Sequence, residues 1–181
     1  MNIPEQLQQK LNYPPLQVID ANTGLPENEA EFDELRQSAL ITFLAGLYKA
    51  TRTKEGAFLI SSKDTATALL SSIFINQNAI TEQIASNTNQ TSDIVKMKLE
   101  EVATGFLSID EYKTNATATN EDENFKTLLT SQRHEILRYL PGKLKIGDLL
   151  NDESLEDNTN KMEGPVSSLM HKIENAFSSA D

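Results

Sequence analysis

The sequence predicts an all-α fold, a compact bundle of about seven or eight helices. Apolar residues recur at intervals of three and four in several separate stretches, which is the spacing of one helix face. No stretch alternates apolar and polar residues for long enough to indicate a sheet. Prolines, glycines and capping residues separate the periodic stretches, as expected of helices joined by short turns.

The N-terminal part is expected to begin with a short helix over residues 4–11. The consecutive prolines at positions 14 and 15 stop it, because the residue before a proline is pushed out of the helical region. Residues 16–20 have the composition of a brief extended segment, and a turn follows them. Residues 1–24 are therefore interpreted as a flexible N-terminal segment in front of the helical domain.

The strongest helix signal follows this segment. Asn28 and Glu31 have the spacing of a capping pair, so the central helix is expected to start there and to end near Thr53. Residues 39–50 are apolar on nearly every side, which indicates a helix surrounded by other helices. Gly56 is expected to break the helix, with a few extended residues after it.

The rest of the chain repeats one pattern, a capping or starting residue followed by an apolar stripe. Pro141 and Gly142 end the longest of these later stretches. Residues 25–181 are expected to form a single helical domain, with a polar loop near 112–120 and an acidic loop near 151–160. The later helices are expected to start near Asp64, Asn78, Thr91, Asn120, Lys145 and Pro165.

The amino-acid composition limits the kinds of partner that the protein is expected to bind. The formal net charge is −11, so nucleic acid and anionic membranes are disfavoured, because both require clustered lysine and arginine. Cysteine is absent, which excludes disulfides, thiolate metal sites and a cysteine nucleophile. The longest apolar stretch, residues 39–48, is too short to span a bilayer, and the N-terminus lacks a secretory signal. We expect a cytoplasmic protein with no membrane partner, no cofactor and no metal.

The stretch IASNTNQTSDIVKMKL, residues 84–99, has the spacing of a helix-turn-helix. Such a motif needs a small residue in its first helix, a turn residue that tolerates positive φ, a hydroxyl cap and apolar anchors. Two bundle helices joined by a polar turn would need the same residue types, so this alternative stays open. The five positions are Ala85, Asn89, Thr91, Val95 and Leu99.

Charge separates these two interpretations. Asp93 lies in the first turn of the second helix, where a DNA-reading helix usually contacts bases, and Glu100 and Glu101 follow. Carboxylates there repel phosphate, so the pattern favours helix packing over DNA recognition. If the motif does bind DNA, the contacting residues are expected to be Thr91, Ser92, Lys96 and Lys98.

The same region carries a resemblance. The stretch LLSSIFINQNAITEQIASNTNQTSDIVKMKLEEVATGFLS, within residues 69–110, resembles a segment of the YidB-like family of small bacterial proteins. The shared features are a run of short helices and a turn followed by a hydroxyl cap. Family members often carry glycine in that turn, where this chain has Asn89. The resemblance implies a bacterial, helical protein, and it supplies no activity and no catalytic residues.

Other sequence patterns that could indicate a metal site or a catalytic site are weak. Residues 151–158 are rich in carboxylates, but no glycine stands at the sixth position that a calcium-binding loop requires. His134 and His171 have charged neighbours, which is typical of surface histidines. No nucleophile elbow, phosphate-binding glycine loop or zinc motif is present. We therefore expect no catalytic residue in any of these stretches.

Three classes of function remain. The leading one is a non-enzymatic protein-interaction or scaffold module, in which helix faces are the working surface. A helix-turn-helix DNA-binding module that uses residues 84–99 is the second. An enzyme whose site is assembled from distant helices is the third and the least favoured. The last stripe, residues 165–178, is expected to be an amphipathic helix that packs on its own chain or on a partner, which includes a second copy.

Overall fold

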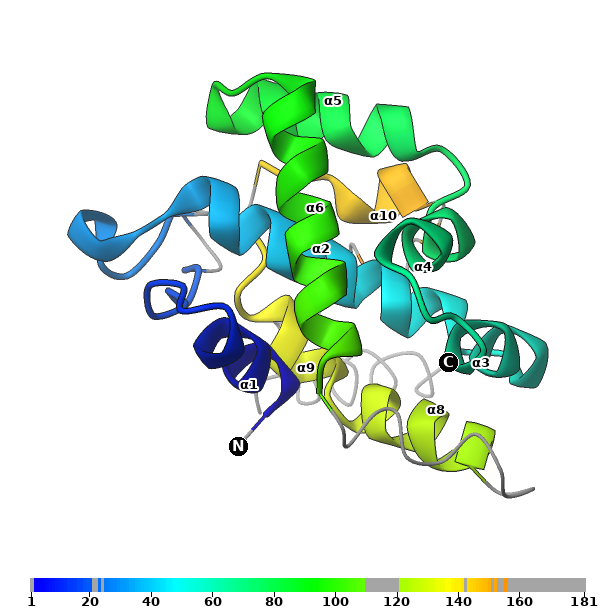
Figure 1. Cartoon of the computed structure of the whole chain (residues 1–181). Coiled ribbons are helices and arrows are strands. Elements are labelled where there is room, and N and C mark those ends of the chain that lie inside the picture. The colour runs from blue at the N-terminus through cyan, green and yellow to red at the C-terminus, as the bar shows by residue number, and fades with distance from the viewer. Residues whose placement is uncertain are drawn as a thin grey trace, which may run out of the picture.

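Helices make up the architecture in this computed structural model, which describes residues 2–20, 23, 25–109, 121–141, 143–150, 152 and 155. The predicted all-α fold is confirmed in these residues, where one isolated antiparallel bridge pairs Ile19 with Pro26. The helices, which Figure 1 labels, are α1 (Ile3–Lys10), α2 (Glu34–Ala50), α3 (Lys54–Ser61), α4 (Ala66–Ile73), α5 (Gln77–Thr88), α6 (Ser92–Leu107), α8 (Glu121–Ser131), α9 (Arg133–Leu137) and α10 (Ile146–Leu150). A short 3-10 turn, η1 (Glu29–Glu31), precedes α2.

Helix α2 is the centre of the bundle. Every residue from Gln37 to Tyr48 is buried, so this helix has no solvent face over three turns. Helix α6 crosses in front of it in Figure 1, and α1, α4, α5 and α9 also pack against it. The rings of Phe43 and Phe106 meet edge to face, with centroids 5.4 Å apart, where α2 and α6 cross. The predicted surrounded helix is therefore confirmed.

The start of α2 lies five residues beyond its predicted start. The Asn28 side chain accepts a hydrogen bond from the backbone N–H of Ala30 at 3.3 Å, which closes the short turn η1 and not α2. Asp33 is the N-cap of α2, because its carboxylate accepts the backbone N–H of Arg36 at 2.9 Å. A carboxylate at this position also interacts favourably with the positive end of the helix dipole.

Gly56 does not break the chain into an extended segment, as the sequence suggested, but lies in the first turn of α3. Thr53 caps this helix by accepting the backbone N–H of Gly56 at 3.0 Å. A Cβ added at Gly56 would lie 1.9 Å from the backbone oxygen of Ala50. Glycine is needed there because α3 starts in direct contact with the end of α2.

The N-terminal segment belongs to the core. Ile3 and Leu7 of α1 are 2% and 0% exposed, and Tyr13 after the helix is 6% exposed. Helix α1 packs against α2, α6 and α9. The predicted domain boundary at residue 25 is therefore not observed. The apolar residues of α1 are spaced at one helix face, and this face is buried against the rest of the bundle.

A buried glutamine holds the extended segment after α1. Gln37 of α2 is 3% exposed, and its Oε1 accepts the backbone N–H of Gln17 at 2.8 Å. Its Nε2 donates to the backbone oxygens of Gln17 at 2.8 Å and of Tyr139 at 2.7 Å. One side chain thus satisfies three backbone groups from two segments that are distant in the sequence.

The other boundaries agree with the sequence to within a few residues. Thr65 and Asn76 cap α4 and α5, next to the predicted positions. The helix that was expected to end at Pro141 is divided at Gln132, whose side-chain oxygen accepts the backbone N–H of Ile3 at 3.2 Å. The predicted last helix, the polar loop and most of the acidic loop lie outside the described residues. Among the described residues, no helix combines the length and apolar character needed to cross a membrane.

Candidate functional site

The predicted turn between two helices is present between α5 and α6. Asn89 follows α5 with φ 53° and ψ 41°, the left-handed conformation that asparagine tolerates better than most residues. Thr91 caps α6, and its Oγ1 accepts the backbone N–H of Ile94 at 3.4 Å. Ala85 is 7% exposed, while Val95 and Leu99 are fully buried. The local geometry is therefore the one that the spacing predicted.

The exposed face of α6 is mixed in charge. Thr91, Ser92 and Lys96, three of the four predicted DNA-contacting residues, are exposed. Asp93 and Glu101 are exposed on the same helix, so carboxylates accompany the lysine. Since phosphate contacts require a positive surface, this face matches a DNA backbone poorly.

Lys98, the fourth predicted contact, does not face outward as expected. Its side chain is 19% exposed, and its Nζ forms an ion pair with Glu101 at 2.5 Å. The same Nζ lies 5.6 Å from the centre of the Tyr13 ring, within the range of a cation–π contact. Lys98 therefore contributes to packing between α6 and the N-terminal segment, which the spacing along α6 alone does not reveal.

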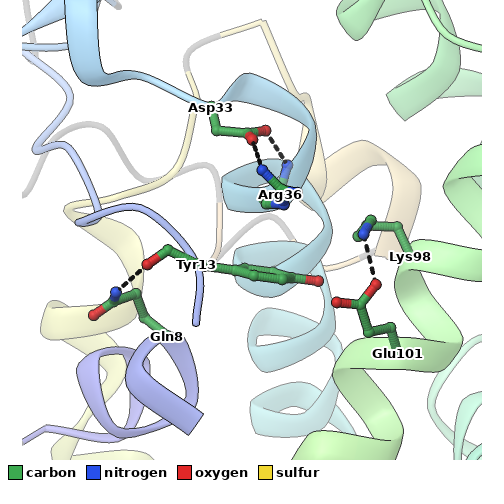
Figure 2. A network of polar contacts seen from close by, with 6 residues as sticks. All are labelled: Gln8, Tyr13, Asp33, Arg36, Lys98 and Glu101. Atoms are coloured by element: carbon green, nitrogen blue, oxygen red, sulfur yellow. Dashed lines mark hydrogen bonds and ion pairs between the residues drawn. The ribbon is translucent and has the colours of Figure 1, made fainter. Parts of the chain in front are cut away.

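Tyr13 is the centre of a polar network that sequence reasoning missed (Figure 2). The Arg36 guanidinium lies 5.5 Å from the centre of the Tyr13 ring, and Arg36 forms an ion pair with Asp33 at 2.6 Å. The side-chain amide of Gln8 donates to the Tyr13 backbone oxygen. The network joins α1, α2 and α6. A signal was available, because this tyrosine follows an amphipathic helix in a chain with few aromatic residues.

The Tyr13 phenol is held in its neutral form. Burial is the main cause that raises its pKa above the ordinary value, and the negative charge of Glu101 raises this pKa further. Figure 2 shows the hydroxyl pointing toward the side chains that α6 contributes. A group with a pKa raised in this way keeps its proton near neutral pH.

A test of this network uses alkaline pH. The unfolded chain releases the Tyr13 proton near pH 10, whereas the folded chain retains it, so stability falls above that pH. The contribution of Tyr13 is about 1.4 kcal/mol per pH unit between the unfolded and the folded pKa. We expect Tyr13→Phe to show a shallower decrease than the unmodified chain in urea unfolding between pH 9.5 and 11. Parallel curves for the two proteins would contradict the raised pKa.

An open groove lies beside this network. Its wall includes Pro14 and Pro15 from the N-terminal segment, Phe32 before α2, and Gln90 in the turn before α6. Carboxylates border the groove, from Glu31, Asp33 and Glu34. The surface next to the turn is therefore acidic, which further disfavours a phosphate backbone at this place.

A second surface is more distinctive, and the sequence did not point to it. Helix α3 buries Ala57 and Ile60 in the core, at 0% and 3% exposure. Its opposite face carries Phe58 and Leu59, which are 65% and 45% exposed. Glu55 and Ser62, at helical spacing from these two, are exposed on the same side. The four consecutive apolar residues 57–60 indicated an extended segment, whereas in a helix they place apolar groups on both faces.

Helix α8 is a neighbour of α3 and carries a further exposed apolar residue. It packs against α3, and both helices lie at the same end of α2 in Figure 1. Leu128 of α8 is 36% exposed, next to the fully buried Leu129. We call the outward residues Phe58, Leu59 and Leu128 the α3–α8 surface. The other large apolar residues exposed in the described part are separate from α3 and α8, at Leu25, Ile75 and Met97.

The remaining predicted positions form no site in the described residues. His134 is exposed on α9, and His171 lies outside the described residues. Asp152, from the acidic loop, forms an ion pair with Arg52 at 2.7 Å. In the described part of the chain, no three histidine or carboxylate side chains gather in a way that could hold a metal ion.

Comparisons with known protein families, curated proteins and solved structures found no match to this chain. The resemblance of residues 69–110 to the YidB-like family therefore stays a prediction.

Proposed function

We propose that this chain is a non-enzymatic protein-interaction module that docks an amphipathic helix on the α3–α8 surface. The observation that carries the proposal is the exposure of Phe58 and Leu59, at 65% and 45%, on a helix whose other face is in the core. Exposed apolar side chains that gather on one face of a helix are typical of a protein-interaction site.

The chemistry of the surface fits a helix as the docked element. Aromatic residues, phenylalanine among them, are enriched at protein interfaces, and an amphipathic helix binds by laying its apolar face on an apolar surface. The spacing of Glu55, Phe58, Leu59 and Ser62 gives one ridge along α3, and α8 lies beside it. Ridges of this kind pack into the grooves of a second helix at an interaxial distance of about 8–10 Å.

The test is a titration of a labelled peptide with the sequence of residues 164–181, which carries the predicted amphipathic stripe. The protein is the full chain with Leu169→Asp and Ile173→Asp, so that its own stripe does not compete. We expect a saturable increase in fluorescence anisotropy. Phe58→Ser with Leu59→Ser in the same background should weaken binding by about tenfold or more, since each removes a large interface side chain.

The matched control is Ile75→Ser, which removes an apolar side chain that is 99% exposed between α4 and α5. This change should leave the affinity unaltered. Absence of binding, or an equal loss in the control, would contradict a specific docking surface on α3 and α8.

DNA binding remains a second candidate because one observation favours it, the turn at Asn89 with the Thr91 cap. The inward position of Lys98 and the carboxylates around the turn oppose it. We expect labelled random-sequence duplex DNA to show no binding at micromolar protein, even at low salt, where phosphate contacts are strongest. Salt-sensitive binding that is lost on Lys96→Glu, at an exposed lysine of α6, would establish the helix-turn-helix function instead.

A further inference from the structure

The end of the described chain lies next to the start of α3. Lys49 of α2 donates from its Nζ to the backbone oxygen of Leu150, and Arg52 pairs with Asp152 at 2.7 Å. Leu155 is 3% exposed and belongs to the core cluster. Arg52 directly precedes Thr53, the N-cap of α3. Asp152 therefore lies close to the start of α3, and so to the α3–α8 surface.

The length of the following chain is sufficient to cover that surface. Residues 156–164 span up to about 30 Å when extended. A helix over 165–178 is about 21 Å long, whereas α3, with its eight residues, is about 12 Å long. The predicted helix can thus reach α3 and overlie it completely without strain in the connection.

The sequence of this segment has the matching character. Gly164 and Pro165 provide a favoured helix start, and the apolar residues after them recur at intervals of three and four. Such a stripe needs an apolar surface to cover it. The stripe consists of Val166, Leu169, Met170, Ile173 and Phe177.

We infer that residues 165–178 dock as a helix on the α3–α8 surface of their own chain, in the place that a partner's helix would take. This inference rests on the proposed docking function of that surface. A connection of only nine residues, 156–164, gives an effective concentration of about millimolar, so the attached segment outcompetes a second copy of the chain at micromolar concentration. A partner must therefore displace the segment before it binds.

The test is a distance measurement between two spin labels in the full chain. Because the chain has no cysteine, Asp64→Cys after α3 and Ser179→Cys after the segment give two unique attachment sites. We expect a narrow distance distribution centred below about 40 Å, since packed helices lie about 8–10 Å apart and the segment is about 21 Å long. The labelled protein is diluted with unlabelled protein, so that the distance measured is intramolecular.

Two variants that disrupt the proposed contact are compared with one control variant in the same distance measurement. Phe58→Asp with Leu59→Asp should broaden the distribution, as should Leu169→Asp with Ile173→Asp, whereas the control Ile75→Asp should leave it narrow. Phe58 and Leu59 on α3, and Ile75 between α4 and α5, are all exposed, so the fold is expected to persist. A broad distribution in the unmodified chain, or a narrow one that survives Phe58→Asp with Leu59→Asp, would overturn the inference.

The peptide titration separates this inference from the proposed function. Under the inference, the peptide of residues 164–181 binds the unmodified chain at least tenfold more weakly than the Leu169→Asp, Ile173→Asp chain. Equal binding to both chains would overturn docking of the segment in its own chain and leave the docking surface intact. A narrow distance peak that disappears on dilution with unlabelled protein would instead place the segment on a second copy.

Discussion

Replacing Gln37 with leucine is expected to lower the free energy of unfolding by about 3 kcal/mol or more. The change leaves one backbone N–H and two backbone oxygens in the interior without their partners, and each such group costs about 1–3 kcal/mol. The affected groups belong to Gln17 and Tyr139. Urea unfolding followed by far-ultraviolet circular dichroism measures the loss.

The matched control for this prediction is Gln17→Ala. The Gln17 side chain donates only to the backbone oxygen of Pro15 at 3.2 Å, and its own backbone bonds to Gln37 survive the substitution. We expect a loss below about 1 kcal/mol, the ordinary value of one hydrogen bond. A similar loss in both variants would contradict the central role of the Gln37 side chain.

A pair of phenylalanines should show the largest contrast between core and surface. Phe43 is fully buried and meets Phe106 edge to face, so Phe43→Ala is expected to cost about 3–5 kcal/mol of stability. Phe58 is 65% exposed, so in the chain with Leu169→Asp and Ile173→Asp, where the segment 165–178 is not expected to cover it, Phe58→Ala should change stability by about 0.5 kcal/mol or less. Thermal or urea unfolding of the two variants measures this difference.

Comparing Phe43→Ala with Phe58→Ala also tests the proposed function of the α3–α8 surface. If Phe58→Ala cost as much stability as Phe43→Ala, then Phe58 would be a structural residue and the α3–α8 surface would lose its main component. If Phe58→Ala is neutral for stability and weakens peptide binding, then the residue serves docking, which is the pattern expected of an interface residue outside the core.

The sequence predicted those features that depend on local patterns. The buried helix α2, the left-handed turn at Asn89 and the Thr91 cap each follow from residues within one or two helical turns. The start of α2 was misplaced, because Asn28 and Asp33 are both good caps and only the packing of the N-terminal segment decides between them.

The features that the sequence did not predict depend on contacts between distant segments. In the sequence, Gln37 is a single polar residue near the start of a helix. Only the fold brings the backbone oxygens of Gln17 and Tyr139 within hydrogen-bond distance of its side chain. The helical spacing predicted that Lys98 faces solvent. In the structure, the ring of Tyr13 and the carboxylate of Glu101 hold its side chain against the N-terminal segment. The run of four apolar residues 57–60 suggested an extended segment. If residues 54–61 had been predicted as a helix, the same residues would have indicated the apolar outer face of α3.

The most direct test of the docking proposal locates the binding site by hydrogen–deuterium exchange. The full chain with Leu169→Asp and Ile173→Asp is compared with and without the peptide of residues 164–181. The proposal predicts slower exchange confined to α3 and α8. Slower exchange in α6 or around the turn at Asn89, with α3 unchanged, would contradict it and would move the working surface to the helix-turn-helix.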